Sequence, residues 1–414
     1  MPRLEAAVIL MEINFSSIKQ LYPQKVSFEG LSKEKPLVPF DEKTIEFLND
    51  LSKELINIEE VREYPDVATF AFFCRRGNII SLRKKHISEK VLRLGRGIVF
   101  HIAPSNVPVN FAYSLICGLL SGNLNIVRVP SKLFRQVELI TEAIKKTGEK
   151  EKYSEIARKI ILISYDRTST ATKYLSSICD VRVIWGGDET VSKIRENPLS
   201  PRAFDITFAD RYSLCIIHAD KYIEALNKVK VANDFYNDTY LFDQNACTAP
   251  NLVVWIGDEK KVLKAKKIFW KELHNVLLAK QYVVQSIIAV DKLTAFYNQS
   301  ILGTKITKSQ GEDNLIWRAD MNELDVNIED YRCSSGYFSE YRATSLCEIS
   351  KIINRKYQTL AYLGFDKQQF LDFILQEKPN GIDRIVPIGR TSDFSLVWDG
   401  VELINTLSRV IELK

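Results

Sequence analysis

The stretch Ile98-Val99-Phe100-His101-Ile102-Ala103-Pro104-Ser105-Asn106-Val107-Pro108 decides the fold of this chain. Its first five residues are mostly apolar and predict a buried strand, and a polar turn rich in proline then interrupts the run. An apolar segment at about 109–120 is predicted to be helical, and Gly122-Asn123 is typical of a helix C-terminus. The stretch therefore predicts a strand, a turn and a helix in that order.

Strands and helices continue to alternate after this first unit. We predict further strands at 125–129, 159–163, 181–185 and 204–208, and helices at about 132–147, at 168–179 and from 189. Alternating elements of these lengths form βαβ units on a parallel sheet, so we expect an α/β protein with a Rossmann-type nucleotide-binding domain. The chain has no GxGxxG after its first strand, so the ordinary dinucleotide fingerprint is absent.

A second series of strands and helices begins at 213–217 and runs to about residue 350. It contains one long amphipathic helix at 258–280, whereas residues 300–345 are polar and are predicted to be irregular. The first ninety residues are expected to form helices that lead into the first domain.

The length of 414 residues favours two domains. We expect residues 1–210, with about 380–414 returning to them, to form the nucleotide-binding domain. Residues 211–380 are expected to form a second α/β domain that carries the chemistry.

Composition indicates a soluble globular protein, with 46% hydrophobic and 26% charged residues. The net charge of +5 is spread over small clusters without interleaved aromatic residues, which argues against a nucleic-acid surface. The longest apolar stretch, at 111–120, is about half the length of a membrane span. The N-terminal residues, which include Arg3, Glu5 and Glu12, do not resemble a signal peptide.

The seven cysteines form no CxxC pair, and several lie in apolar runs. This pattern predicts reduced thiols in a cytoplasmic protein, not a disulfide framework. The four histidines are too scattered to indicate a zinc site, so no metal is expected. His101 and His218 lie near strand ends, and a core or capping role is the better prediction for both.

Cys247 is the cysteine whose position best suits chemistry. It ends the polar segment Asp243-Gln244-Asn245-Ala246-Cys247 and lies between two more apolar runs, whereas a packing cysteine usually lies within one. Reactivity also requires a lowered pKa, so the position alone is more typical of an inert structural cysteine.

Three polar turns follow predicted strands of the first domain: 103–108, 129–132 and 186–188. The carboxyl ends of parallel strands share one edge of a sheet, where open α/β sheets bind ligands. Each turn also has an ordinary interpretation. Asn106 could simply form a turn, Gly186-Gly187 could precede a helix, and Lys132 could face solvent.

These segments together resemble known families. Pro104-Ser105-Asn106 is similar to the Pro-Trp-Asn turn of the aldehyde dehydrogenase superfamily, and Cys247 lies where that superfamily has its catalytic cysteine. A closer resemblance is to the bacterial acyl-CoA reductase family LuxC. The segments that resemble it are 101–108, 122–131, 243–247, 383–390 and 398–400, and the resemblance extends from roughly residue 60 to the end.

The resemblance implies an aldehyde dehydrogenase-like fold in which Cys247 attacks a thioester carbonyl and carries the acyl group. The Asn106 side-chain amide and the Cys247 backbone N–H are implied as the donors to the oxyanion. The cofactor-binding positions that we assign on this basis are Pro104, Ser105, Arg128, Pro130, Ser131, Lys132, Gly186 and Gly187.

Two departures from hydrolytic aldehyde dehydrogenases affect the predicted reaction. Those enzymes have a glutamate that activates water, but the corresponding stretch 208–213 has none, and Asp210 is a weaker alternative base. A thiol needs less help from a base than water does, so this loss favours exchange with coenzyme A. Lys132 stands where hydrolytic relatives have an acid that binds the adenine ribose, and a cation there suits the 2′-phosphate of NADPH. Arg128 is the alternative cation.

The sequence is therefore interpreted as an NADPH-dependent reductase that converts a fatty acyl-CoA, or an acyl group on a partner protein, to the aldehyde. The family implies acyltransferase or acyl-protein synthetase partners, and a homo-oligomer is compatible with it. One alternative is an aldehyde dehydrogenase that oxidises aldehydes to acids. Another is an inactive scaffold of the same fold.

Overall fold

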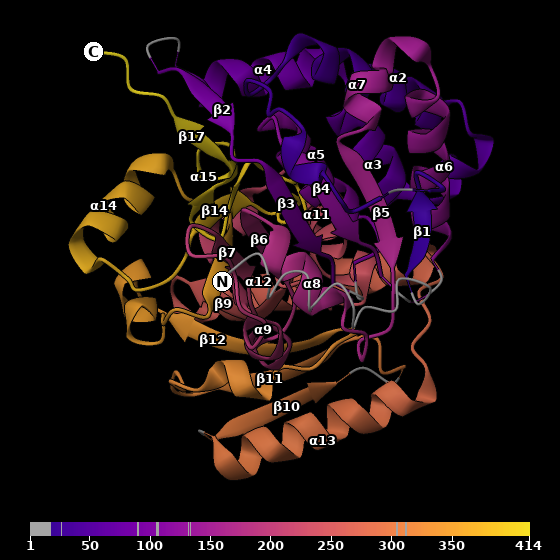
Figure 1. Cartoon of the computed structure of the whole chain (residues 1–414). Helices are drawn as coiled ribbons and strands as arrows, with labels where there is room; N and C mark the ends of the chain where they lie inside the picture. The colour runs from indigo at the N-terminus through magenta and orange to yellow at the C-terminus, as the bar shows by residue number, and fades with distance from the viewer. Residues whose placement is uncertain are drawn as a thin grey trace. The chain divides into compact units, whose positions relative to one another are not determined.

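In the computed structural model of the chain, the described residues are 18–25, 27–88, 91–104, 107–130, 132, 134–303, 305–310 and 313–414 (Figure 1). The chain divides into two compact units. Unit 1 comprises Met1–Ala209 and Leu396–Lys414, and unit 2 comprises Asp210–Ser395. Each unit has its own sheet with helices, so the predicted α/β class is confirmed.

The main sheet of unit 1 has the strand order β1-β5-β4-β3-β6-β7. The strands are β1 (Lys19–Tyr22), β5 (Ile160–Ser164), β4 (Leu124–Arg128), β3 (Ile98–Ile102), β6 (Val181–Trp185) and β7 (Phe204–Phe208). β1 is antiparallel to β5, and the other neighbours are parallel. The chain order reverses between β3 and β6, which makes the carboxyl ends of these two strands a topological switch point. The predicted Rossmann-type sheet is confirmed.

The helices of unit 1 are α2 (Glu42–Ile56), α3 (Pro65–Phe73), α4 (Arg76–His86), α5 (Asn110–Leu120), α6 (Arg135–Gly148), α7 (Ser154–Ala157), α8 (Ala171–Ile178), α9 (Asp188–Arg195) and α15 (Leu403–Leu407). A small antiparallel pair joins β2 (Arg93–Gly95) to β17 (Ser408–Val410), and β15 (Val397–Trp398) pairs with β16 (Val401–Glu402). The C-terminal segment thus returns to unit 1 through β17.

α5 packs directly on the central strands of unit 1. A Cβ atom at Gly118 would lie 1.7 Å from the side chain of Asn125, so only glycine permits this approach. His101 is buried beside it and hydrogen-bonds to the hydroxyl of Ser114 (2.7 Å) and to Asn125 Oδ1 (3.1 Å). Burial lowers the pKa of His101 to about 4, so the ring is neutral near pH 7. The prediction of a core role for His101 is confirmed.

The sheet of unit 2 has the order β10-β11-β12-β9-β8-β13-β14. Its strands are β10 (Ile306–Gln310), β11 (Trp317–Met321), β12 (Tyr337–Ala343), β9 (Pro250–Ile256), β8 (Tyr212–His218), β13 (Tyr357–Leu363) and β14 (Arg384–Pro387). β10 is antiparallel to β11, and the other pairs are parallel. The helices are α10 (Ala219–Glu224), α11 (Lys228–Thr239), α12 (Glu259–Ala279), α13 (Ser286–Leu302) and α14 (Lys367–Glu377).

Two sequence predictions about unit 2 are wrong. Residues 300–345, predicted to be irregular, contain β10, β11 and β12. Polar residues interrupt the apolar pattern of β11 and β12, and partners far along the chain satisfy them; Asp320 of β11, for example, accepts from Lys266 Nζ at 2.9 Å. Glu340 of β12 is fully buried and accepts hydrogen bonds of 2.8 Å from the indole N–H groups of Trp255 and Trp270.

The second wrong prediction is the point at which the chain returns to unit 1. The return was expected at about residue 380, but residues up to Ser395 belong to unit 2. The cause is β14, which pairs in parallel with β13 and extends the sheet of unit 2 by one strand.

Candidate active site

Cys247 lies on the turn between η5 (Tyr240–Phe242) and the amino end of β9. Its side chain is half-buried. The Ser213 hydroxyl of β8 donates to the carbonyl oxygen of Cys247 at 2.7 Å and accepts from the backbone N–H of Thr359 at 3.2 Å. One hydroxyl therefore ties the main chain of Cys247 to both β8 and β13.

Gln244 anchors the same turn to the sheet. Asp243 and Gln244 both have left-handed backbone conformations, with φ of 50° and 60°. The buried amide of Gln244 accepts from the N–H groups of Gly336 (2.8 Å) and Tyr337 (3.2 Å). It also donates to the carbonyl oxygens of Pro250 and Tyr337, each at 3.0 Å. These four bonds, each worth roughly 1 kcal/mol net, oppose the cost of the left-handed residues.

Gln358 of β13 provides a side-chain partner of the thiol. Its Nε2 group donates to Cys247 Sγ over 3.5 Å, and the Gln358 side chain is buried. A donor to sulfur stabilises the thiolate relative to the thiol, and the thiolate is the nucleophilic form. Sequence reasoning did not select Gln358. The available signal was a glutamine within the otherwise apolar segment 357–363.

Arg384 of β14 adds a half-buried positive charge to the same region. Its guanidinium donates to the carbonyl oxygens of Thr391 (2.8 Å), Arg390 (3.0 Å) and Asp393 (2.6 Å). Burial lowers the pKa of Arg384 below its usual range, and the carboxylates of Asp393 and Asp238 and the thiol of Cys247 act in the opposite direction. Arg384 therefore lies within electrostatic range of Cys247, where a cation favours the thiolate.

Ion pairs hold the stretch 208–213, where hydrolytic aldehyde dehydrogenases have their water-activating glutamate. The Asp210 carboxylate pairs with Arg332, and Arg211 pairs with Asp383. Arg332 also donates to the Arg211 carbonyl oxygen at 2.9 Å. Asp210, the alternative base, thus has its carboxylate engaged by a guanidinium.

All of these groups in unit 2 lie near the amino ends of parallel strands. Cys247 precedes β9, Ser213 is near the start of β8, Gln358 is near the start of β13, and Arg384 begins β14. The predicted ligand positions at carboxyl ends of strands concerned only the first domain. The two units therefore carry their candidate site residues at opposite ends of their strands.

Gln358→Leu should slow alkylation of Cys247, because leucine fills a similar volume but cannot donate to sulfur. We expect the pH at which alkylation by iodoacetamide reaches half its maximal rate to rise by about one unit, as follows from losing one hydrogen bond to a charged group. Peptide mass spectrometry of the labelled protein measures this rate at Cys247. The matched control is Gln368→Leu on exposed α14. An unchanged profile in Gln358→Leu would show that the amide does not influence the thiol.

In unit 1, the predicted cofactor residues flank the switch point. Pro104 follows β3, and Gly186 and Gly187 follow β6. A Cβ atom at Gly187 would meet nothing within 4 Å, so the backbone before α9 faces open space that a ligand could approach. Ser105, Asn106 and Ser131 lie outside the described residues.

The two candidate cations at and beyond the carboxyl end of β4 differ in their surroundings. Arg128 donates to the carbonyl oxygen of Tyr165 at 3.2 Å, and its guanidinium lies 4.7 Å from the centroid of that ring. Its buried Nε has no hydrogen-bond partner among the described residues. Lys132 is exposed, with its ammonium 5.0 Å from the centroid of Phe134. Pro130 lies between them and is buried. Arg128 is thus partly committed to β5, whereas Lys132 is accessible to a ligand.

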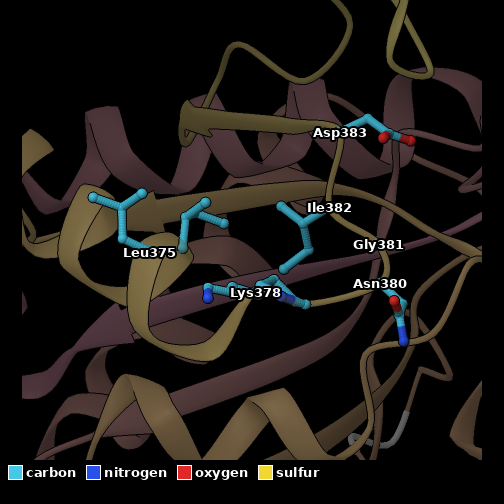
Figure 2. Close-up of a pocket in the computed structure, with 8 residues that line it drawn as sticks. Leu375, Lys378, Asn380, Gly381, Ile382 and Asp383 are labelled. Carbon is cyan, nitrogen blue, oxygen red and sulfur yellow. The ribbon is translucent and has the colours of Figure 1, made fainter.

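A surface pocket of about 520 Å³ lies beside the C-terminal end of α14 in unit 2 (Figure 2). It is lined by Ile374, Leu375, Lys378, Pro379, Asn380, Gly381, Ile382 and Asp383. The backbone N–H of Asp383 donates to the Gln358 carbonyl oxygen at 2.9 Å. One wall of this pocket is therefore connected to the strand that carries Gln358.

The described residues offer neither a metal-binding cluster nor a membrane-spanning helix. Their His, Cys, Asp and Glu side chains form no group of three or more that could hold a metal ion. The helices of that part of the chain are all too short or too polar to cross a membrane.

Comparison with solved structures identifies the class of fold. The salicylaldehyde dehydrogenase from Pseudomonas putida G7 has a TM-score of 0.63 and 14% identity, with 92% of this chain and 87% of that chain covered. The NAD-dependent benzaldehyde dehydrogenase from Corynebacterium glutamicum has a TM-score of 0.62 and 13% identity, with 96% and 95% covered. The chain has the aldehyde dehydrogenase fold.

Comparison with family models identifies the family within this fold. The model of the family described as Acyl-CoA reductase (LuxC) matches residues 81–410, and the chain belongs to this family. The long-chain acyl-protein thioester reductase of Aliivibrio fischeri is 27% identical over 165 residues, which cover 39% of this chain and 33% of that protein. The protein of the same name from Vibrio harveyi is 25% identical over 211 residues, covering 48% and 42%. The matched regions thus span less than half the length of these relatives.

Proposed function

We propose that this protein reduces an acyl thioester to the corresponding aldehyde, with Cys247 carrying the acyl group. The observation that carries the proposal is the arrangement around the thiol: Gln358 donates to Sγ, and the half-buried Arg384 lies within electrostatic range. Membership of the acyl-CoA reductase family supports the same reaction.

In the first step, the Cys247 thiolate attacks the thioester carbonyl carbon and forms a new C–S bond. The carbonyl π electrons move to oxygen, and the negative charge that develops there needs donors. The backbone N–H of Cys247 is a suitable donor because Ser213 and Gln244 fix the main chain of the turn. We assign the second donor to the Asn106 side chain on the motif alone. The tetrahedral intermediate then collapses, and the departing thiolate takes up a proton and leaves acyl-Cys247.

The second step requires a hydride donor, which a nicotinamide cofactor would supply to the acyl carbon. The residues of unit 1 fit such a group, since the strand order reverses between β3 and β6 and Gly187 leaves the backbone open. Pro104, Gly186 and Gly187 would hold it at this edge. The first turn of α9 carries Asp188 and Glu189, whose negative charges repel a phosphate. Positive charge from Arg128 and Lys132, at and beyond the end of β4, is therefore needed to balance the charge of a bound pyrophosphate. Cys247 then departs as a thiolate from the reduced carbon and releases the aldehyde.

Hydrolysis to an acid is disfavoured in this arrangement. Water requires a positioned base, whereas a thiol leaving group does not. Asp210 has its carboxylate paired with Arg332. This ion pair favours thioester exchange over the acid-forming reaction of an aldehyde dehydrogenase.

The test is mass spectrometry of the intact protein after incubation with a series of acyl-CoA thioesters, without a nicotinamide cofactor. We expect an acyl adduct that maps to Cys247, and release of aldehyde when NADPH is added. The matched control is Cys347→Ser, which removes another half-buried thiol and should leave the adduct unchanged.

Acyl groups on a carrier or synthetase protein are the second set of donors in the same experiment, because the acyl donor is either coenzyme A or a partner protein. If no donor acylates Cys247, the covalent mechanism fails and an inactive scaffold is favoured. Formation of the acid instead of the aldehyde would indicate an aldehyde dehydrogenase.

We further propose that the cofactor is NADPH and that Lys132 binds its 2′-phosphate. Lys132→Glu should shift the preference toward NADH, because a carboxylate repels the phosphate and accepts from the ribose hydroxyl. A charge-assisted bond is worth about 1.5–3 kcal/mol, so the ratio of kcat/KM for the two cofactors should change at least about tenfold. The control is Lys145→Glu, which reverses an exposed charge on α6. If Lys132→Glu leaves the ratio unchanged and Arg128→Leu alters it, the assignment moves to Arg128.

A further inference from the structure

The inner face of α13 in unit 2 buries polar side chains that an ordinary surface helix exposes. Its fully buried residues are Lys292 and Gln299. Lys292 Nζ donates to the carbonyl oxygen of Asn314 at 2.8 Å. Gln299 accepts from the Tyr337 hydroxyl at 2.7 Å and donates to Ser339 Oγ at 3.1 Å. Ala295 and Phe296 pack beside them against Trp317 and Tyr337. α13 therefore attaches to its own unit through a mixed polar and apolar face, and its remaining apolar side chains lie elsewhere on the helix.

A second set of apolar side chains, on α13 and its flanks, faces outward. We call the following set the outer stripe: Val283, Ile287, Val290, Leu293, Tyr297, Ile301 and Leu302, which are 37–81% exposed. Most of them are spaced three or four residues apart, so they lie along one side of the helix, opposite Lys292 and Gln299. α13 contains only two charged residues, Asp291 and Lys292, and Lys292 is buried. The outer stripe is thus apolar and nearly uncharged.

The outer stripe is large enough to form an interface. The exposed fractions of its seven residues correspond to roughly 800 Å² of surface, about one partner's share of a standard-size interface. An apolar patch larger than a few hundred Å² is unusual on a monomer and marks a contact surface. Its length, about 25 Å for a helix of this size, also suits a helix–helix contact.

We infer that the outer stripe of α13 is the surface through which two copies of this chain associate. A two-fold pair of identical stripes is self-complementary, because apolar residues face apolar residues and the helices carry few like charges. β10 packs beside α13 and ends the sheet, and among the described residues it pairs only with β11 (Figure 1). A second copy at this margin would cover the stripe and shield the open strand edge.

A lipid surface fits the stripe less well than a second copy. Helices that lie on membranes usually carry Lys and Arg on their polar face, where these residues contact anionic headgroups. The only lysine of α13 is buried against Asn314 and is unavailable for that role. The inference concerns assembly and does not depend on the reaction proposed for Cys247.

The test is sedimentation velocity of the full chain across a range of concentrations. The unmodified protein should be a dimer, and the double variant Val290→Glu/Ile301→Glu should raise the dissociation constant at least about 100-fold, because each interface would bury four unpaired carboxylates. Leu263→Glu on α12 is the control, since it places the same charge on an exposed leucine outside the stripe. A monomeric unmodified protein, or a dimer that the double variant leaves intact, would overturn the inference.

Cross-linking provides a second measurement that introduces no charge into the stripe. Val290→Cys treated with a short bismaleimide should yield covalent dimers, whereas Leu263→Cys should yield only the background of the unmodified protein. Equal yields from the two variants would contradict the inference. The contrary outcome is that the unmodified protein sediments with vesicles of neutral and anionic phospholipid and that the double variant does not. That result would assign the stripe to a membrane instead.

Discussion

Cys247→Ser is expected to abolish aldehyde formation and acylation together. A serine hydroxyl is a poor nucleophile near neutral pH without a positioned base, whereas the cysteine it replaces receives a hydrogen bond from Gln358. Asp210 has its carboxylate paired with Arg332 and is poorly placed to serve as that base. We expect activity to fall by at least about 10³-fold, within the range that base assistance usually contributes.

Gas chromatography of the aldehyde measures this loss, and circular dichroism checks that the variant is folded. Cys347→Ser should retain full activity, since that thiol is also half-buried but lies away from the Gln358 amide. If Cys247→Ser continues to form aldehyde at a rate near that of the unmodified protein, the reaction does not pass through an acyl-cysteine.

Asn106→Ala is expected to have the second largest effect, a fall in turnover of roughly 10²–10³, which is typical for the loss of one oxyanion donor. Asn106 lies outside the described residues, so this expectation rests on its place in the Pro104-Ser105-Asn106 turn and on the family resemblance. The KM values for acyl thioester and cofactor should change little, because the oxyanion exists only near the transition state.

Asn106→Asp provides the comparison of shape with chemistry. Aspartate has nearly the same size and also favours turns, but its ionised carboxylate accepts hydrogen bonds and repels an oxyanion. If Asn106 donates to the oxyanion, both variants should lose turnover in steady-state kinetics. A purely structural asparagine would instead allow Asn106→Asp to retain it.

The first sheet was predictable because its strands are buried on both faces. Such strands form continuous apolar runs bounded by turn residues, and 98–102 and 181–185 were placed at their observed limits. β11 and β12 were missed because their polar residues are satisfied by partners far along the chain. The contact of Glu340 with Trp255 is an example, and local periodicity contains no record of it.

The candidate site was likewise only partly predictable from the sequence. Cys247 could be selected from its polar surroundings and its family resemblance. Gln358 and Arg384 could not be selected, because they approach the thiol only through the pairing of β8, β13 and β14. Gln358 is 111 residues from Cys247 in sequence, and no spacing rule connects positions that a sheet brings together.

The four hydrogen bonds of Gln244 have a consequence for the entropy of the reaction. They attach the turn of Cys247 to β9 and to the start of β12, so the nucleophile is ordered when the chain folds. Binding of an acyl thioester then does not have to immobilise a mobile loop, and less binding free energy is lost to that ordering. A substrate that acylates Cys247 would therefore meet a sulfur whose backbone position is set before binding.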